Sequence, residues 1–299
     1  MFLAAQVPAK GYCTYSLSVD SVGIANQLQI SSTLLENRFF RMIIDDKGTF
    51  SSLYDKINQR ELLPPGQRGN QLQAFEDKPA EFDNWNIDPY YQEKMWELDT
   101  VEEVTVIEQG PVRGGISIRK KFLDSVVTQQ IYIYNDLPRI DFDTHVDWKE
   151  NQVLLKAAFP LDIHADKATY EIQFGNVERS THRNTSWDIA QFEVSAHKWA
   201  DLSETGFGVS LLNDCKYGYD IKDGMMRLTL IKSGNEPNPE AGKNIGFFIP
   251  FTLMKEIGKP VKPYKWPIVL MSRSIQSWKG RTRDGCRLGC PCSGSIRSM

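Results

Sequence analysis

The strongest constraint on the fold is a series of short segments in which polar and apolar residues alternate. The pattern is clearest in residues 129–142, where it continues on both sides of a break at Asn135-Asp136. Alternation with a period of two indicates strands that bury one face. No helical period extends over ten residues before the C-terminal segment. The sequence therefore predicts antiparallel sheets packed face to face.

A hairpin is expected near the start of this series. Residues 39–44 lead into Asp45-Asp46-Lys47-Gly48, and residues 49–54 return. Aspartate favours the turn, and the glycine can take a positive φ. Further strands are expected at residues 102–108, 115–122, 126–134 and 139–148.

Residues 173–218 hold two of the four histidines and two of the seven tryptophans. A loop that carries Arg179, His182 and Arg183 would either line a polar site or form a hydrogen-bonded surface corner. Short strands are expected at residues 171–174, 191–194 and 207–212, separated by polar turns at residues 183–186 and 201–204.

Residues 69–90 combine acidic and aromatic side chains. Carboxylates accept hydrogen bonds from sugar hydroxyls, and an aromatic ring covers the C–H face of a pyranose. The alternative is a solvated acidic loop. A glycosidase places its two carboxylates roughly 5–9 Å apart, and a loop sequence does not fix such a pair. The candidate sugar contacts here are Asp77, Asp83, Trp85 and Asp88.

The histidines and cysteines show no metal-binding pattern. His182 and His197 are widely spaced, whereas zinc sites favour close pairs. Cys215 is interpreted as a small apolar filler. The remaining cysteines do not make a disulfide scaffold, and the three near the C-terminus lack a fourth zinc ligand. We therefore expect no metal in this chain and a cytoplasmic location.

At 299 residues and 41% hydrophobic content, the chain is long enough for a large core. It has no run of 18 apolar residues, so no membrane span is expected. Its net charge of −3 hides an asymmetry, because eleven basic and two acidic residues lie between Lys243 and Met299. A basic tail usually suggests nucleic-acid or membrane binding.

Four segments resemble glycoside hydrolase family 38, the α-mannosidases, and especially their cytosolic and bacterial branch. They are GNQLQAFEDKPAEFDNWNID, ERSTHRNTSWD, FEVSAHKWADLSE and GFGVSLLNDCKYG. The resemblance runs from about Gln6 to Ser233 and is to the C-terminal region of that family. It implies an all-β fold, namely a large antiparallel two-layer sandwich of the galactose-mutarotase-like type.

The resemblance also implies a function. These enzymes hydrolyse α-mannosidic bonds with retention, using a zinc-held mannose and a carboxylate nucleophile. Both zinc and nucleophile belong to an N-terminal domain, so residues 1–30 are expected to be a linker that follows a missing catalytic domain. Residues 31–242 would form the sandwich, the cleft wall and the sugar subsites. Gln71 falls near a sugar-contacting tyrosine of Golgi-type relatives.

The resemblance ends before the basic tail. Read in the neighbouring frame, residues 248–266 are compatible with the family's continuation, including a Y-P-H motif. We therefore expect a frameshift, natural or a sequencing error, near Gly242 and an aberrant, irregular tail over residues 243–299. The tail charge would then not indicate a nucleic-acid or membrane partner.

The expected partners are a mannose-containing oligosaccharide, a catalytic domain on a separate chain, and a second copy of this chain. A rival hypothesis is a free-standing carbohydrate-binding or mutarotase-like sandwich, in which His182 or His197 would act with Glu178 or Glu193. A third alternative is a gene remnant without function.

Overall fold

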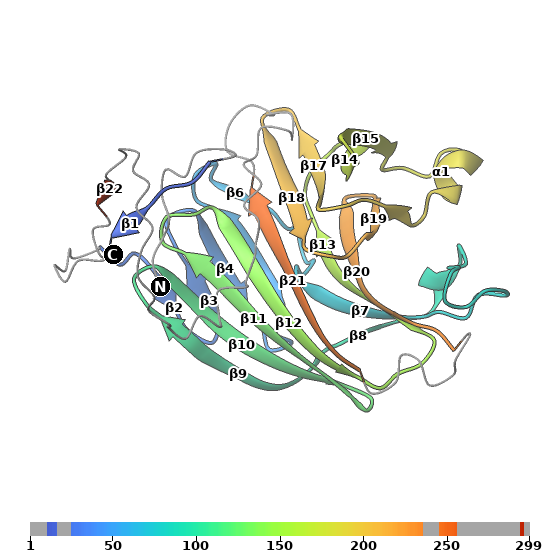
Figure 1. The fold of residues 1–299 in the computed structure, drawn as a ribbon, viewed down its shortest axis with the longest axis horizontal. Coiled ribbons are helices and arrows are strands. Elements are labelled where there is room, and N and C mark those ends of the chain that lie inside the picture. Colours follow the sequence, from blue (N-terminus) through green and yellow to red (C-terminus); the bar gives the residue numbers. More distant parts are fainter. Residues whose placement is uncertain (1–10, 17–24, 236–244, 256–293, 296–299) are drawn as a thin grey trace, which may run out of the picture. The chain divides into compact units, whose positions relative to one another are not determined.

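The computed structural model describes residues 11–16, 25–235, 245–255 and 294–295. The chain divides into two units, Met1–Ala25 with Lys262–Met299, and Asn26–Val261. In the first unit, β1 (Tyr15–Ser16) and β22 (Gly294–Ser295) form a parallel pair. The second unit holds the other described strands (Figure 1).

The largest sheet of the second unit has nine strands, each antiparallel to its neighbours. In spatial order they are β15 (Gly175–Ser180), β14 (Lys167–Ile172), β17 (Trp199–Glu204), β18 (Phe207–Asn213), β21 (Ile245–Lys255), β12 (Arg139–Trp148), β11 (Ser125–Tyr134), β10 (Arg113–Phe122) and β9 (Thr100–Gln109).

Two smaller antiparallel sheets complete the unit. The six-stranded sheet has the order β16 (Val194–Ser195), β19 (Gly218–Lys222), β20 (Met225–Ser233), β13 (Val153–Pro160), β7 (Gln71–Glu76) and β8 (Met95–Glu97). The five-stranded sheet has the order β2 (Gln29–Ile30), β3 (Leu34–Glu36), β4 (Phe40–Ile44), β5 (Phe50–Asp55) and β6 (Arg60–Glu61).

The core lies between the nine-stranded and six-stranded sheets. Phe142 of β12 stacks on Phe251 of β21 at 4.6 Å between ring centroids, and its edge meets Phe159 of β13 at 5.6 Å. Such aromatic pairs add about 0.5–1.5 kcal/mol beyond the apolar area that they bury. The fully buried rings join both layers, which confirms the predicted antiparallel sandwich.

The predicted hairpin is confirmed as β4 and β5. One carboxylate oxygen of Asp45 accepts hydrogen bonds from the backbone N–H groups of Lys47 and Thr49, at 3.1 and 2.8 Å. Gly48 has a φ of +64°, and a Cβ at this position would lie 2.8 Å from Ile118. A glycine is therefore required both by the turn and by the neighbouring strand.

The predicted polar turn at residues 201–204 is wrong, because these residues belong to β17. Ala200 and Leu202 are buried on one face. On the other face, the Asp201 carboxylate accepts hydrogen bonds from the hydroxyls of Ser203 and Ser210, each at 2.6 Å. Polar residues that satisfy one another across a ladder can thus occupy a strand.

The loop between β15 and β16 is mostly not extended. Of the predicted strand at residues 191–194, only Val194 is in a strand. A short helix, α1 (Ser186–Ala190), begins with a capping box in which Thr185 and Asp188 satisfy each other's backbone N–H groups. The only other described helical segment is η1 (Tyr91–Glu93), and no described helix is long and apolar enough to cross a membrane.

The nine-stranded sheet continues beyond the expected boundary at residue 242. β21 lies between β18 and β12 and pairs with both (Figure 1). Its alternate residues Ile249, Phe251 and Leu253 are buried, so this part of the expected irregular tail has a strand pattern. The three C-terminal cysteines and most of the basic residues counted there lie outside the described residues.

Candidate functional site

The candidate site lies on the outer face of the six-stranded sheet. The aromatic loop, residues 77–94, crosses this face and contains η1. Tyr91 packs its ring against Phe75 of β7 at 5.2 Å and against Phe192 at 6.2 Å. Phe192 belongs to the histidine loop, residues 181–193. The two loops therefore meet over a small apolar cluster of their own.

A buried lysine lies at the centre of this face. The Lys156 side chain is 0% exposed and forms an ion pair with Glu193 at the end of the histidine loop. Its ammonium also donates to the Tyr91 hydroxyl at 3.0 Å. The hydroxyl in turn donates to Asp220 of β19 at 2.9 Å. One lysine thus connects both loops to the sheet.

The network continues across the sheet through Arg227 of β20. Its guanidinium forms an ion pair with buried Asp220 at 2.9 Å and donates to Gln73 of β7 at 2.8 Å. Gln73 donates to Gln71 at 3.3 Å, and Gln71 donates to Glu97 of β8 at 3.2 Å. Polar side chains therefore span the sheet from β19 to β8.

Two pKa shifts define the protonation state of the network. Burial alone would lower the pKa of Lys156, but the negative charge of Glu193 raises it to about 12. Burial raises the pKa of Tyr91 to about 12, against the opposing effect of Lys156. The lysine stays charged and the tyrosine neutral at neutral pH. The network is therefore a fixed arrangement of charges rather than an acid–base pair.

Two of the acidic candidates fix the aromatic loop to neighbouring strands. Asp77 is buried and forms an ion pair with Lys232 of β20. Burial raises the pKa of Asp77, and Lys232 opposes that rise. Asp83 accepts hydrogen bonds from the backbone N–H of Asn235 at 2.6 Å and from Gln152 at 3.4 Å. Both carboxylates connect the loop to neighbouring strand ends.

Of the other two candidates in this loop, Trp85 is exposed and Asp88 is partly buried. Trp85 is 71% exposed. Asp88 accepts a hydrogen bond from the backbone N–H of Ala80 at 3.2 Å, which closes the loop on itself. Phe82 and Tyr90 are exposed as well. The loop thus presents aromatic rings to solvent while its acidic residues hold its shape.

The histidine loop and the strand before it carry the remaining candidates. Arg179 of β15 lies over the Tyr170 ring at 4.8 Å, and one of its amino groups is buried with no hydrogen-bond partner among the described residues. Arg183 forms an ion pair with Asp223. His182 Nδ1 lies 3.5 Å from Asp188, whose pKa is lowered by hydrogen bonds from Thr185 and Ser180 and by His182.

A lysine that the sequence did not suggest positions this loop. Lys222 of β19 donates to the backbone carbonyl oxygens of Ser180 at 2.8 Å, and of His182 and Asp188 at 3.3 Å each. Burial lowers its pKa. Charged hydrogen bonds of this kind contribute roughly 1.5–3 kcal/mol each when well formed.

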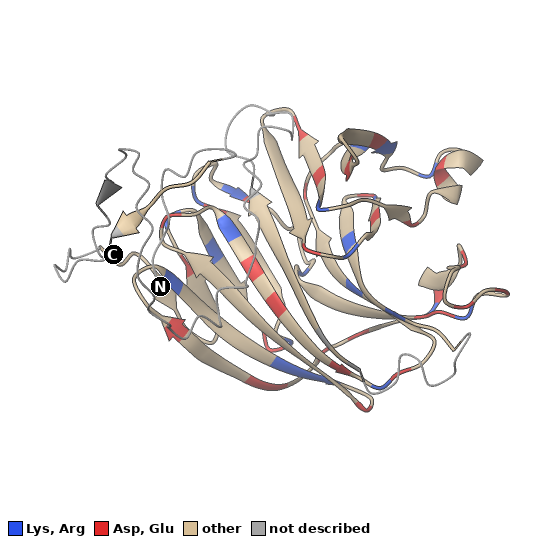
Figure 2. Cartoon of the chain, viewed as in Figure 1, with Lys and Arg blue, Asp and Glu red and all other residues tan. Residues whose placement is uncertain are grey.

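The candidates fall into three groups. Gln71 lies in the sheet with its amide bonded to neighbouring side chains. Asp77, Asp83, Trp85 and Asp88 belong to the aromatic loop. Arg179, His182 and Arg183 lie in or next to the histidine loop. Figure 2 shows acidic and basic residues on both loops. The groups are connected by Lys156 and Arg227, which the sequence did not single out, and by Glu193, which the sequence named only for the rival hypothesis.

Within the described part of the chain, no three His, Cys, Asp or Glu side chains are grouped so that they could hold a metal ion.

The sequence matches one family directly. A profile described as "Glycosyl hydrolases family 38 C-terminal domain" covers residues 35–240. The chain belongs to glycoside hydrolase family 38. This match contains the aromatic loop, the histidine loop and the network between them.

Curated relatives agree with this assignment. The chain is 42% identical over 212 residues to alpha-mannosidase G of Dictyostelium discoideum, covering 69% of this chain and 19% of the relative. It is 38% identical to human alpha-mannosidase 2C1, covering 70% of this chain and 20% of that protein. The match thus spans about a fifth of these relatives.

A solved structure supports the fold. An alpha-mannosidase from Enterococcus faecalis superposes with a TM-score of 0.65 over 78% of this chain and 30% of that one, at 16% identity. At this identity the likeness concerns the architecture alone.

Proposed function

We propose that this chain is the C-terminal portion of a retaining α-mannosidase that hydrolyses mannose-containing oligosaccharides. The observation that carries the proposal is the match of residues 35–240 to the C-terminal domain of family 38, together with 42% identity to an alpha-mannosidase. Because the chain covers about a fifth of such relatives, the activity is proposed for the assembled enzyme.

Within that enzyme, we propose that the two loops form the cleft wall and outer sugar subsites. The exposed Trp85 ring offers a face for the C–H side of a pyranose. The half-buried carboxylate of Asp88 can accept hydrogen bonds from hydroxyl groups, and the half-exposed Arg183 and His182 can donate to them. The buried network beneath holds both loops in place before substrate arrives, which reduces the entropy lost on binding.

Other groups would support these subsites or lie outside the two loops. The nucleophile and the zinc ligands would come from the catalytic domain, on the same or a separate chain. Buried Asp77 and Asp83 would position the aromatic loop, and Gln71 would anchor the sheet beneath it. Homo-oligomer contacts and a cytoplasmic location stay predictions.

The reading-frame change near Gly242 also stays a proposal. The family match ends at residue 240, which supports it. Sequencing the genomic DNA across this position tests it. An unshifted frame in independent clones would exclude the idea, and an open neighbouring frame that encodes the Y-P-H motif would support it.

The rival hypothesis of a free-standing mutarotase-like protein gains no support from the contacts. Glu193 is bound by Lys156 and by the Thr229 hydroxyl. His182 faces Asp188, and His197 packs against Tyr217 at 5.5 Å. A His–Glu acid–base pair is therefore not favoured by the described geometry.

A chimera tests the proposed function. The matching region of Dictyostelium alpha-mannosidase G is replaced by residues 35–240 of this chain. We expect zinc-dependent hydrolysis of an aryl α-mannoside. In the chimera, Trp85→Ala should lower kcat/KM for a mannose oligosaccharide about tenfold and leave the aryl substrate less affected.

The matched control is Leu123→Ala, which removes an exposed apolar side chain from the turn between β10 and β11. It should leave both substrates unaffected. A folded chimera without mannosidase activity would refute the proposal. Zinc-dependent turnover by the isolated chain would refute the assignment of the catalytic groups to another domain.

A further inference from the structure

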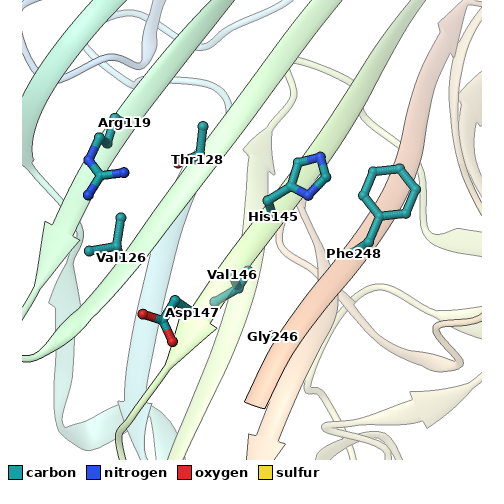
Figure 3. A pocket seen from close by; sticks show the side chains of 8 residues that line it. All are labelled: Arg119, Val126, Thr128, His145, Val146, Asp147, Gly246 and Phe248. Carbon is teal, nitrogen blue, oxygen red and sulfur yellow. The ribbon is translucent and has the colours of Figure 1, made fainter. Parts of the chain in front are cut away.

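A polar groove lies on the outer face of the nine-stranded sheet, away from the two loops. It has a volume of about 410 Å³. Its lining comes from four adjacent strands, β10, β11, β12 and β21 (Figure 3). The lining residues are Arg119, Val126, Thr128, His145, Val146, Asp147, Gly246 and Phe248.

The ladder explains where the groove is. Arg119, Thr128, His145 and Phe248 are directly paired across the four strands and form one row. Two residues along, Val126 and Asp147 are paired, and Gly246 is paired with Asp147. Because Gly246 has no side chain, the second row leaves a hollow beside the Phe248 ring and the Asp147 carboxylate.

The walls of the groove are rigid because they are built from paired strands. Every lining residue sits in a strand with hydrogen-bonded neighbours. The Arg119 guanidinium is held by Glu102 of β9 through Nε at 2.8 Å. The His145 ring lies beside the Phe248 ring at 4.7 Å between centroids. A preformed site of this kind loses little conformational entropy when a ligand binds.

The polar groups of the groove are balanced between donors and acceptors. Arg119 donates, Asp147 accepts, and Thr128 and His145 can do both. Phe248 and Val126 supply apolar surface beside them. The charges around the groove are paired, because Arg119 is bound by Glu102 and the Asp147 carboxylate lies 3.6 Å from the Lys149 ammonium. Such paired charges suit a neutral ligand, whose hydroxyl groups can donate to the carboxylates and accept from Arg119.

We propose that this groove binds a neutral pyranose unit of an oligosaccharide. The sugar ring would lie beside Phe248, and its hydroxyl groups would bond to Asp147, His145 and Arg119. Because the groove is open and encloses one unit only, binding of a single sugar is weak, with a Kd on the order of 1 mM. The groove would let this chain hold a glycan by its own residues, whatever catalytic domain accompanies it.

The proposal stands apart from the proposed function. Arg119, Thr128, His145 and Asp147 lie within the region matched by the family, but no residue of either loop lines the groove. A folded chimera without mannosidase activity would not count against sugar binding in the groove. A groove that binds no sugar would not count against the mannosidase proposal. The two experiments therefore fail separately.

The experiment follows the His145 ring protons by NMR in the complete 299-residue chain. Methyl α-mannoside and a linear mannotriose serve as probes, with sodium sulfate as an anionic probe. We expect saturable shifts with both sugars at similar Kd values, because the groove encloses one unit. Asp147→Ala should weaken binding at least tenfold, measured through the Phe248 ring signals, because it removes a carboxylate acceptor.

Two controls separate the groove from its surroundings. Thr105→Ala changes an exposed residue of β9 on the same face, outside the groove, and should bind normally. Trp85→Ala changes the aromatic loop and should also bind normally. The proposal is overturned if His145 does not shift up to 50 mM sugar, about fifty times the expected Kd. It is equally overturned if sulfate shifts His145 as strongly as mannotriose does, or if Trp85→Ala abolishes the shifts.

Discussion

Two lysines are buried in this sandwich in opposite ways. Lys156 lies beneath the two loops, on the outer face of the six-stranded sheet, where Glu193 and Tyr91 bind its ammonium. Lys120 lies on the inner face of β10 and is 3% exposed. Among the described residues, its ammonium has no hydrogen-bond partner. One lysine thus connects several elements, and the other only bears the energetic penalty of burial.

The neighbours of Lys120 explain its lack of a partner. Asp99 is already bound by Lys47 at 2.6 Å and lies 3.6 Å from Arg68. Asp45 accepts the N–H groups of the β4–β5 turn. Burial therefore lowers the pKa of Lys120 to about 8, although Asp99 and Asp45 act in the opposite direction. The difference between the two lysines is the availability of a carboxylate, not the depth of burial.

The largest predicted effect comes from breaking the Lys156 network. Lys156→Met leaves Glu193 without its cation and leaves the Tyr91 hydroxyl with Gln92 in place of two donors. Removing one partner of a buried ion pair typically destabilises a protein by about 3–5 kcal/mol. Urea unfolding at pH 7 measures the loss.

The double variant Lys156→Met with Glu193→Leu sharpens this result. It removes both charges, so it should recover more than half of the lost stability. If the double variant is no more stable than the single one, the ion pair is not the source of the effect.

Lys120→Met should raise the free energy of unfolding, whereas Lys156→Met lowers it. A lowering of the pKa from 10.5 to about 8 corresponds to roughly 3 kcal/mol of destabilisation at neutral pH, using about 1.4 kcal/mol per pKa unit. Replacing the lysine removes this penalty, and methionine has a similar length. We expect a gain of up to about 3 kcal/mol in urea unfolding at pH 7.

The same lysine gives a pH dependence with a defined sign. Between pH 8 and 10.5 the unfolded chain keeps the Lys120 proton and the folded chain loses it. The unfolded state then binds more protons, so stability rises with pH in this window. The free energy of unfolding of the wild type, measured relative to that of Lys120→Met, should show this rise. A constant difference from pH 7 to 10 would contradict the assignment.

Lys222 is an intermediate case, because its ammonium donates to neutral carbonyl groups among the described residues. Lys222→Met leaves three carbonyl oxygens of residues 180–188 without this donor. We expect a loss of about 1–2 kcal/mol, concentrated in the histidine loop, because two of the hydrogen bonds are long and the burial cost of the Lys222 charge offsets part of their gain. Limited proteolysis should cut this loop faster. Lys167→Met, at an exposed ion pair with Glu178, is the control and should change neither quantity appreciably.

The smallest effect is expected from the uncharged Thr185 hydroxyl. Thr185→Ala removes the N-cap of α1 and should cost about 1 kcal/mol, mostly as local fraying. Faster amide exchange in residues 186–190 measures it, whereas Thr185→Asn should keep the cap. Equal exchange in both variants would show that the cap is not needed.

The sequence predicts the sandwich well because strand alternation and turn residues are local signals. The strands β10, β11 and β12 match their predicted ranges within two residues. The polar residues of β17 resemble a turn in the sequence, because Asp201 gains its partner Ser210 of β18 only when the two strands pair.

The site was less predictable, because its connections are between distant residues. Lys156 and Glu193 are 37 residues apart, and Tyr91 is 65 residues from Lys156. One signal was present in the sequence. Lys156 interrupts the apolar run VLLKAAFP, and a charge inside a buried strand requires a partner. Nothing local identified Glu193 as that partner, and the sugar contacts themselves stay predictions.

The position of β21 has a consequence for biosynthesis. β12 leaves the ribosome about 100 residues before β21, which at roughly 5–20 residues per second is a delay of about 5–20 seconds. Until then β12 and β18 both present open edges, since β21 is the strand between them. The nascent chain therefore passes through a period in which two half-sheets are ready to join any extended segment. A holdase chaperone that covers these edges would raise the yield of folded protein in the cell.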